Sequence, residues 1–86
     1  MEECIRPWGY YKVIYHDDGK KVKLIEVLPH HALSLQTHQH RSEHWVVVEG
    51  TARVYIETDK YIHMETIEKN ESIYVPVGAK HKLLNE

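Results

Sequence analysis

The sequence predicts an all-β fold in one small domain spanning residues 1–86. Short segments rich in β-branched and aromatic residues recur along the chain, with turn-forming residues between them. No stretch shows a helical period of useful length, and prolines interrupt the chain at positions 29 and 76. The expected strands cover residues 10–15, 22–28, 33–38, 43–48, 52–57, 61–67 and 72–75. Short strands with regularly spaced turns are typical of a sandwich, a jelly roll or a small barrel.

Turn residues and alternating hydrophobicity support the individual strands. The Asp-Asp-Gly segment at residues 17–19 and the Thr-Asp-Lys segment at residues 58–60 are expected to form hairpin-type turns. Pro-Val-Gly at residues 76–78 should end the strand before it, since proline cannot donate to a sheet and glycine permits positive φ. Within residues 52–57 every second residue is apolar, which predicts a strand with one buried face.

The composition excludes several classes of protein. A net charge of −2 and a pI of about 6.4 carry no electrostatic signature of nucleic-acid binding. No apolar run approaches the roughly 18 residues of a membrane-spanning helix. Cys4 is the one cysteine, so no disulfide forms within the chain, and a lone thiol suits a reducing compartment. We therefore expect a soluble, cytoplasmic protein without a nucleic-acid or membrane partner.

Candidate metal ligands gather near the middle of the chain. Gln36 and His38 are two residues apart on one expected strand, so they face the same side. A turn over residues 39–42 can return Glu43 beside them, and His81 follows the proline–glycine turn downstream. Imidazole nitrogens with carboxylate and amide oxygens form a mixed ligand set that suits Zn, Mn, Fe or Ni. The alternative interpretation is a buried polar network that binds no metal.

The spacing of these residues resembles the two cupin motifs. The first motif runs Gly, five residues, His-x-His, three or four residues, Glu, six residues, Gly. The second runs Gly, five residues, Pro-x-Gly, two residues, His, three residues, Asn. The resemblance implies a small cupin jelly-roll barrel (RmlC-like) and a divalent-metal site formed by Gln36, His38, Glu43 and His81. The matching positions are His30, Gln36, His38, Glu43 and Gly50, followed by Asn70, Pro76, Gly78, His81 and Asn85.

Three positions depart from the cupin pattern. Gln36 stands where the first histidine is usual, and His30 and Asn70 stand where glycine is usual. Asparagine readily adopts the left-handed conformation that a turn glycine would take, and histidine does so less well. A rival register pairs His38 with His40, but it leaves only two residues before the glutamate. We therefore prefer the register that begins at Gln36.

A closer resemblance covers nearly the whole chain. Residues 6–9, 33–36, 40–48 and 50–52 look like the type II phosphomannose isomerase domain, usually the C-terminal part of bifunctional mannose-1-phosphate guanylyltransferase/mannose-6-phosphate isomerases. The resemblance implies metal-dependent interconversion of mannose 6-phosphate and fructose 6-phosphate, with zinc as the first choice of metal. Gln36 fits as a ligand, because type I phosphomannose isomerases use a Gln, His, Glu, His zinc site.

Arg41 is the candidate for binding the phosphate of a sugar phosphate, because its planar fork matches phosphate oxygens. Pairing with a surface carboxylate is the alternative role for this arginine. The catalytic base stays unassigned, with His40 only a weak candidate. Two alternatives to the isomerase remain: a non-catalytic module that binds a sugar or other small molecule through its metal, and a different metal-cupin enzyme such as an oxygenase.

The resemblance also bears on assembly. The family domain continues beyond the position of Asn85 with another strand, whereas this chain stops at Glu86. We therefore expect a barrel that lacks the usual C-terminal strand. Because an unpaired sheet edge invites a partner, we predict a homodimer, with the segment at residues 6–15 a candidate for exchange between the two chains.

Overall fold

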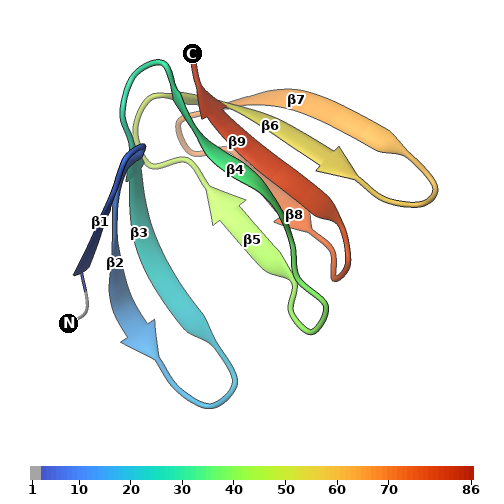
Figure 1. Cartoon of the computed structure of the whole chain (residues 1–86), viewed down its shortest axis with the longest axis horizontal. Helices are drawn as coiled ribbons and strands as arrows, with labels where there is room; N and C mark the ends of the chain where they lie inside the picture. Colours follow the sequence, from blue (N-terminus) through green and yellow to red (C-terminus); the bar gives the residue numbers. More distant parts are fainter. Residues whose placement is uncertain (1–2) are drawn as a thin grey trace.

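The computed structural model describes residues 3–86, apart from the side chains of residues 34–36, and this part of the chain folds into β-strands without helix (Figure 1). The all-β prediction is confirmed. The described residues contain no helix that is long and apolar enough to cross a membrane. The strands are β1 (Glu3–Arg6), β2 (Gly9–His16), β3 (Lys21–Val27), β4 (His31–Thr37), β5 (Glu43–Val46), β6 (Thr51–Glu57), β7 (Ile62–Glu68), β8 (Ser72–Val75) and β9 (Lys80–Asn85).

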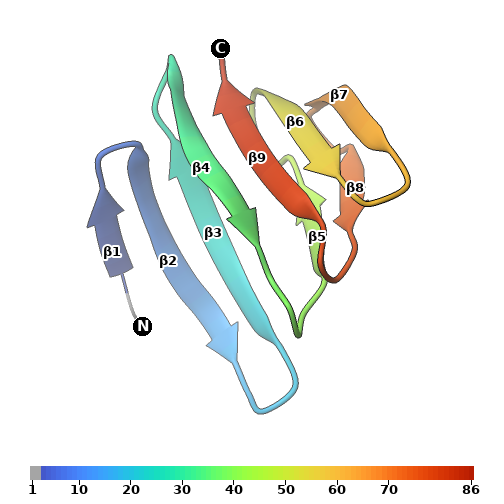
Figure 2. The ribbon, with the colours of Figure 1, turned by 45° about the vertical axis from the view of Figure 1, so that its right-hand side comes forward.

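The strands pair antiparallel into three sheets, which Figure 2 separates most clearly. The first sheet has the order β1-β2-β3, the second has the order β4-β9-β6-β7, and β5 and β8 form a two-stranded ribbon. Between residues 3 and 86 the strand pairing does not close these sheets into a single barrel. The β2–β3 hairpin projects away from the rest of the chain, and β3 is exposed along almost its whole length.

Two strands were not among those expected from the sequence. β1 pairs with β2, and β9 lies between β4 and β6. The segment of β9, Lys-His-Lys-Leu-Leu-Asn, lacks alternating hydrophobicity and is extended because both of its edges pair with neighbouring strands. The strand expected over residues 43–48 ends at Val46, and the side chains of Val46 and Val48 are exposed.

The hydrophobic core lies between the four-stranded sheet and the β5–β8 ribbon. The alternation expected over residues 52–57 is confirmed, because one face of β6 is buried and the other carries polar side chains. Side chains from β7 and β8 complete the core, and partly buried residues of β5, β8 and β9 pack around it. The buried core residues are Ala52, Val54, Ile56, Ile67, Val75 and Ala79, with Trp45, Val47, Ile73 and Leu83 packed against them.

The expected turns form, and their hydrogen bonds explain them. The carboxylate of Asp17 accepts hydrogen bonds from the backbone amides of Gly19 and Lys20, which closes the β2–β3 hairpin. His30 and Asn70, which occupy the glycine positions of the two motifs, have φ values of 63° and 72°. Both residues therefore have the left-handed backbone that a turn glycine would take, His30 included, although histidine adopts it less readily than asparagine.

Asn85, the last residue of the second motif, ties the first two sheets together. Its side-chain amide donates to the carbonyl of Val27 over 2.8 Å, and its backbone carbonyl accepts from the amide of His30 over 2.6 Å. These bonds join the end of β9 to the last residue of β3 and to the connection between β3 and β4. The first sheet is thereby held beside the strands that carry the candidate ligands.

Candidate metal centre

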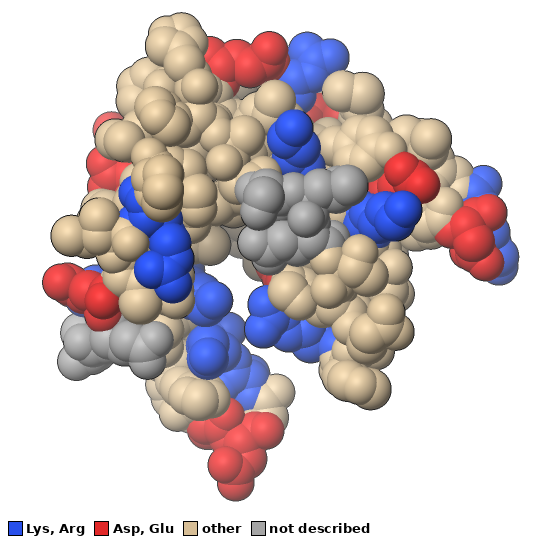
Figure 3. All heavy atoms as spheres, in the orientation of Figure 1, with Lys and Arg blue, Asp and Glu red and all other residues tan. Residues whose placement is uncertain are grey.

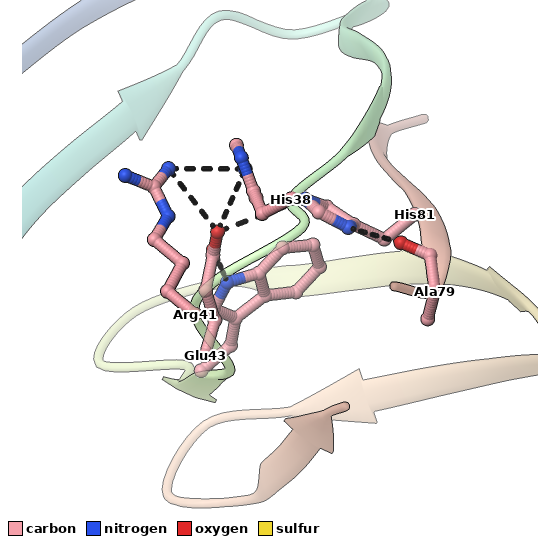
Figure 4. A network of polar contacts seen from close by, with 6 residues as sticks. His38, Arg41, Glu43, Ala79 and His81 are labelled. Carbon is pink, nitrogen blue, oxygen red and sulfur yellow. Dashed lines mark hydrogen bonds and ion pairs between the residues drawn. The ribbon is translucent and has the colours of Figure 1, made fainter. Parts of the chain in front are cut away.

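Three of the four predicted ligands converge. His38 follows the end of β4, Glu43 begins β5 and His81 lies on β9. Oε2 of Glu43 lies 3.0 Å from Nε2 of His38 and 3.8 Å from Nε2 of His81. One ligand atom from each residue lies within 4.8 Å of the others. Figure 4 shows the three side chains approaching from different segments of the chain.

Strand pairing brings these distant residues together. β4 and β9 are neighbours in the four-stranded sheet, and the turn after β8 is fixed to the end of β4 because the amide of Gly78 donates to the carbonyl of His38 over 2.8 Å. Gly78 has a φ of 82°, which glycine adopts without strain. The turn therefore places His81, which is three residues after Gly78, at the site.

Gln36, the fourth predicted ligand, is placed only by its backbone. It is the register partner of His81 in the β4–β9 pair. Residues directly opposite each other in an antiparallel pair share one face of the sheet. The side chain of Gln36 lies outside the described residues, so its role as a ligand stays a prediction.

Hydrogen bonds orient the ligand atoms of His81 and Glu43. His81 is buried, with 4% of the residue's surface exposed, and its Nδ1 lies 3.2 Å from the carbonyl oxygen of Ala79. A carbonyl only accepts, so this contact places the proton on Nδ1 and leaves the lone pair on Nε2 for a metal. The indole Nε1 of Trp45 donates to Oε1 of Glu43 over 2.7 Å, which leaves Oε2 facing the two histidines.

Positive charge lies beside the ligands. Nη2 of Arg41 lies 3.0 Å from Nε2 of His38 and 3.5 Å from Oε2 of Glu43. Burial lowers the pKa of His38 below its ordinary value, and the charge of Arg41 lowers it further. The neutral imidazole, which is the form that binds a metal, is therefore favoured.

The arrangement fits a divalent metal ion. Two ligand atoms that bind the same ion at roughly 2.0–2.2 Å lie about 3–4 Å from each other. The distances from Oε2 of Glu43 to Nε2 of His38 and to Nε2 of His81 fall in that range. Two imidazole nitrogens and one carboxylate oxygen are ligands that zinc and other first-row metals accept. Three protein ligands also leave coordination positions for Gln36 or for a substrate.

The other histidines near the motif do not join the three ligands. His40 is exposed, and the ring of His44 packs edge-on against Tyr74 at 6.5 Å between centroids. Because β5 alternates, His44 faces away from the side that carries Glu43. The register that pairs His38 with His40 therefore finds no support in the geometry.

The sequence did not identify two residues near the site. Trp45 shares the inward face of β5 with Glu43, and the two-residue spacing was the signal that predicts this. The ammonium group of Lys23 lies over the ring of Tyr11 at 4.6 Å from its centroid. Burial lowers the pKa of Lys23, and Arg41 lowers it further. No sequence signal links Lys23 to the site, because its strand lies far from the motif in the chain.

The chain matches a known protein family over its whole length. The family described as "Mannose-6-phosphate isomerase C-terminal" matches residues 1–86. No solved structure matches the chain significantly.

Curated relatives match almost all of the chain. It is 51% identical over 83 residues to "Mannose-1-phosphate guanylyltransferase" of Escherichia coli K12 and 49% identical over 83 residues to "Mannose-1-phosphate guanylyltransferase ManC" of Salmonella typhimurium LT2. It is 42% identical over 83 residues to "Alginate biosynthesis protein AlgA" of Pseudomonas syringae pv. tomato. Each alignment covers 96% of this chain but 16% of the relative. The chain therefore spans about one sixth of the length of these proteins.

Proposed function

Because the chain belongs to the mannose-6-phosphate isomerase C-terminal family, we propose that it binds a hexose 6-phosphate at a divalent-metal site and interconverts mannose 6-phosphate and fructose 6-phosphate. The observation that carries this proposal is the convergence of His38, Glu43 and His81 within 4.8 Å of one another. Zinc is the proposed metal, with Mn, Fe or Ni as the other metals that this ligand set accepts.

The side chains of the site have separate roles in this proposal. His38, Glu43 and His81 hold the metal, and Gln36 is the proposed fourth ligand. A bound divalent metal supplies a Lewis acid that stabilises negative charge on the sugar oxygens. The indole of Trp45 and the carbonyl of Ala79 keep the ligand atoms pointing at a common centre.

Arg41 and Lys23 are the proposed phosphate-binding groups. Arg41 lies directly beside the proposed metal ligands. Its charge is one of the causes that lower the pKa of Lys23, so the two positive charges are close. Figure 3 shows basic side chains on both sides of the hollow beside the β2–β3 hairpin. A phosphate dianion relieves the repulsion between two such cations, and the arginine fork also binds it in a defined orientation.

The relatives favour a second candidate function. The curated proteins that the chain resembles are named for guanylyltransferase activity or for alginate biosynthesis. A domain that makes up 16% of such a protein can serve it by binding a sugar phosphate without converting it. A metal-dependent binding module is therefore the alternative to the isomerase.

Metal content and turnover measured on one sample test both functions. Purified protein is assayed for bound metal by mass spectrometry and for mannose 6-phosphate isomerase activity in a coupled assay. His38→Ala and His81→Ala should each lose the metal and the activity. His63→Ala is the matched control, because His63 lies exposed on β7 and pairs with Glu65 over 2.8 Å.

The outcomes separate the two functions. About one equivalent of metal with turnover, both lost in the two ligand variants, supports the isomerase. Metal and sugar-phosphate binding without turnover supports the binding module. Wild-type protein that takes up no metal, or ligand variants that keep it, would contradict both.

A further inference from the structure

Trp45 contacts two of the three convergent ligands. Its indole Nε1 donates to Oε1 of Glu43 over 2.7 Å. Its ring meets the imidazole of His81 edge-on, with centroids 5.4 Å apart and an angle of 75° between the planes. One side chain therefore restrains a carboxylate from β5 and an imidazole from β9.

The alternation of β5 explains how Trp45 reaches both partners. Glu43 and Trp45 are partly buried on the inner face, whereas His44 and Val46 are exposed on the outer face. The pairing of β5 with β8 places Trp45 opposite Ile73, and both residues pack against the hydrophobic core. The indole is thus held on its apolar side by the core while its N–H points at the carboxylate.

The hydrogen bond constrains the carboxylate in a specific way. Indole nitrogen is a donor only, so its partner must be an acceptor such as a carboxylate oxygen. With Oε1 engaged by Trp45, rotation of the carboxylate would break a charge-assisted bond. Oε2 is therefore kept on the side of the histidines, 3.0 Å from Nε2 of His38.

His81 is restrained from two directions. The carbonyl oxygen of Ala79 lies 3.2 Å from its Nδ1, and the edge-on contact with Trp45 limits rotation of the ring. Groups that orient ligand side chains in this way typically change metal affinity when they are removed. Packing in the core alone would not require the indole N–H to meet a ligand oxygen.

We propose that Trp45 is a positioning residue of the metal centre, which sets metal affinity by holding Oε2 of Glu43 and the ring of His81 toward the shared ion. This inference rests on the metal site of the proposed function. It adds a role for a residue outside the ligand set.

Zinc affinity of Trp45→Phe tests the role of the N–H. Phenylalanine keeps an aromatic ring against His81 and the core but removes the donor to Glu43. We expect the Zn²⁺ dissociation constant, measured by competition with a chromophoric chelator, to rise about 10–100-fold, the usual cost of losing such a partner. Trp8→Phe is the matched control and should leave zinc affinity at the wild-type value.

A double-mutant cycle separates positioning from packing. If Trp45 acts through Glu43, its effect on zinc affinity should largely disappear in the Glu43→Gln background, because the two changes are coupled. An equal loss of affinity in both backgrounds would show that Trp45 acts by packing alone and would overturn the inference. So would a zinc affinity of Trp45→Phe that matches the Trp8→Phe control.

A measurement on the wild-type protein covers the case in which Trp45→Phe fails to fold. The chain has two indole N–H groups, and Trp8→Phe assigns their NMR signals. Adding Zn²⁺ should shift the signal of Trp45 and leave that of Trp8 in place. Equal shifts for both, or none while zinc binds, would contradict the role of Trp45. Wild-type protein that binds no zinc would instead overturn the proposed function.

Discussion

Nη2 of Arg41 lies 3.0 Å from Nε2 of His38, the nitrogen that faces the other two ligands of the candidate metal centre. A guanidinium has donors only and stays charged, so it occupies the lone pair that a metal would need. It also lies 3.5 Å from Oε2 of Glu43, the second ligand atom. Arg41 would therefore compete with a divalent cation for the same two atoms (Figure 4).

Removal of this charge should strengthen metal binding. We expect Arg41→Met to lower the Zn²⁺ dissociation constant about tenfold, because a partly screened like charge beside the ion is lost. The same variant should bind mannose 6-phosphate more weakly, since the phosphate loses its guanidinium partner. Isothermal titration with each ligand measures both effects.

Arg53→Met is the control for that experiment. Arg53 is exposed on β6 and pairs with Glu86 over 3.6 Å, so its loss should change neither affinity. An Arg41→Met protein with unchanged zinc affinity would contradict competition at His38, and one with unchanged sugar-phosphate affinity would contradict the phosphate-binding role.

The lowered pKa of His38 predicts how stability without metal depends on pH. Burial is the main cause of the lowering, and Arg41 adds to it, so folded His38 takes up its proton at a lower pH than in the unfolded chain. In the interval between the two pKa values the unfolded state binds more protons. The contribution of His38 to stability is therefore complete above about pH 6.5 and is lost as the pH falls through the folded value.

Urea unfolding of the metal-free protein at pH 7.5 and pH 5 measures this contribution. Wild-type protein should lose more stability on acidification than His38→Asn, because asparagine does not titrate. An equal loss in the two proteins would show that the environment of His38 does not penalise its charged form.

The left-handed backbone at His30 predicts a stabilising substitution. His30 has a φ of 63°, a conformation that costs a non-glycine residue about 1–2 kcal/mol. Glycine removes this cost, but it also raises the entropy of the unfolded chain, which offsets part of the gain in stability. We expect His30→Gly to stabilise the protein by about 0.5–1 kcal/mol. In a domain of this size that gain raises the melting temperature by roughly 2–8 °C, measured by differential scanning calorimetry.

The neighbouring histidine offers a matched control. His31 begins β4 and its ring Nδ1 lies 2.8 Å from the carbonyl oxygen of Pro29. His31→Gly should destabilise the protein, because glycine weakens an extended strand and this contact is lost. If His30→Gly also lowered the melting temperature, strain at His30 would not be a significant cost.

The outer strand of the first sheet offers a surface for the predicted homodimer. β1 is an outer strand of the β1-β2-β3 sheet, and Ile5 on it is 87% exposed. A second copy that pairs along β1 would extend the sheet and cover this side chain. Light scattering at micromolar concentration should give about twice the chain mass of 10.2 kDa, and Ile5→Lys should shift the protein to a monomer. A monomeric wild-type protein would contradict this prediction.

Local signals in the sequence predicted much of the fold. All seven expected strands agree with the structure to within two residues at each end, and the hairpin at Asp17 forms with the bonds typical of its residues. β9 was missed because its residues lack a strand pattern, and its extended form depends on pairing with β4 and β6. The strand expected over residues 43–48 extended two residues beyond the end of β5.

The sequence by itself determined the β-character of the chain, its turns and the choice of His38, Glu43 and His81 as predicted ligands. These features depend on residue type, on alternation within a strand and on motif spacing, all of which can be read from the sequence. Only the tertiary structure decided that Arg41 faces His38, that Trp45 joins Glu43 to His81 and that Lys23 lies near the same site. The contact between Trp45 and His81 and the position of Lys23 depend on strand order and on the packing of strands far apart in the chain. The contact between Arg41 and His38 depends on the conformation of the loop after β4, which no residue pattern specified.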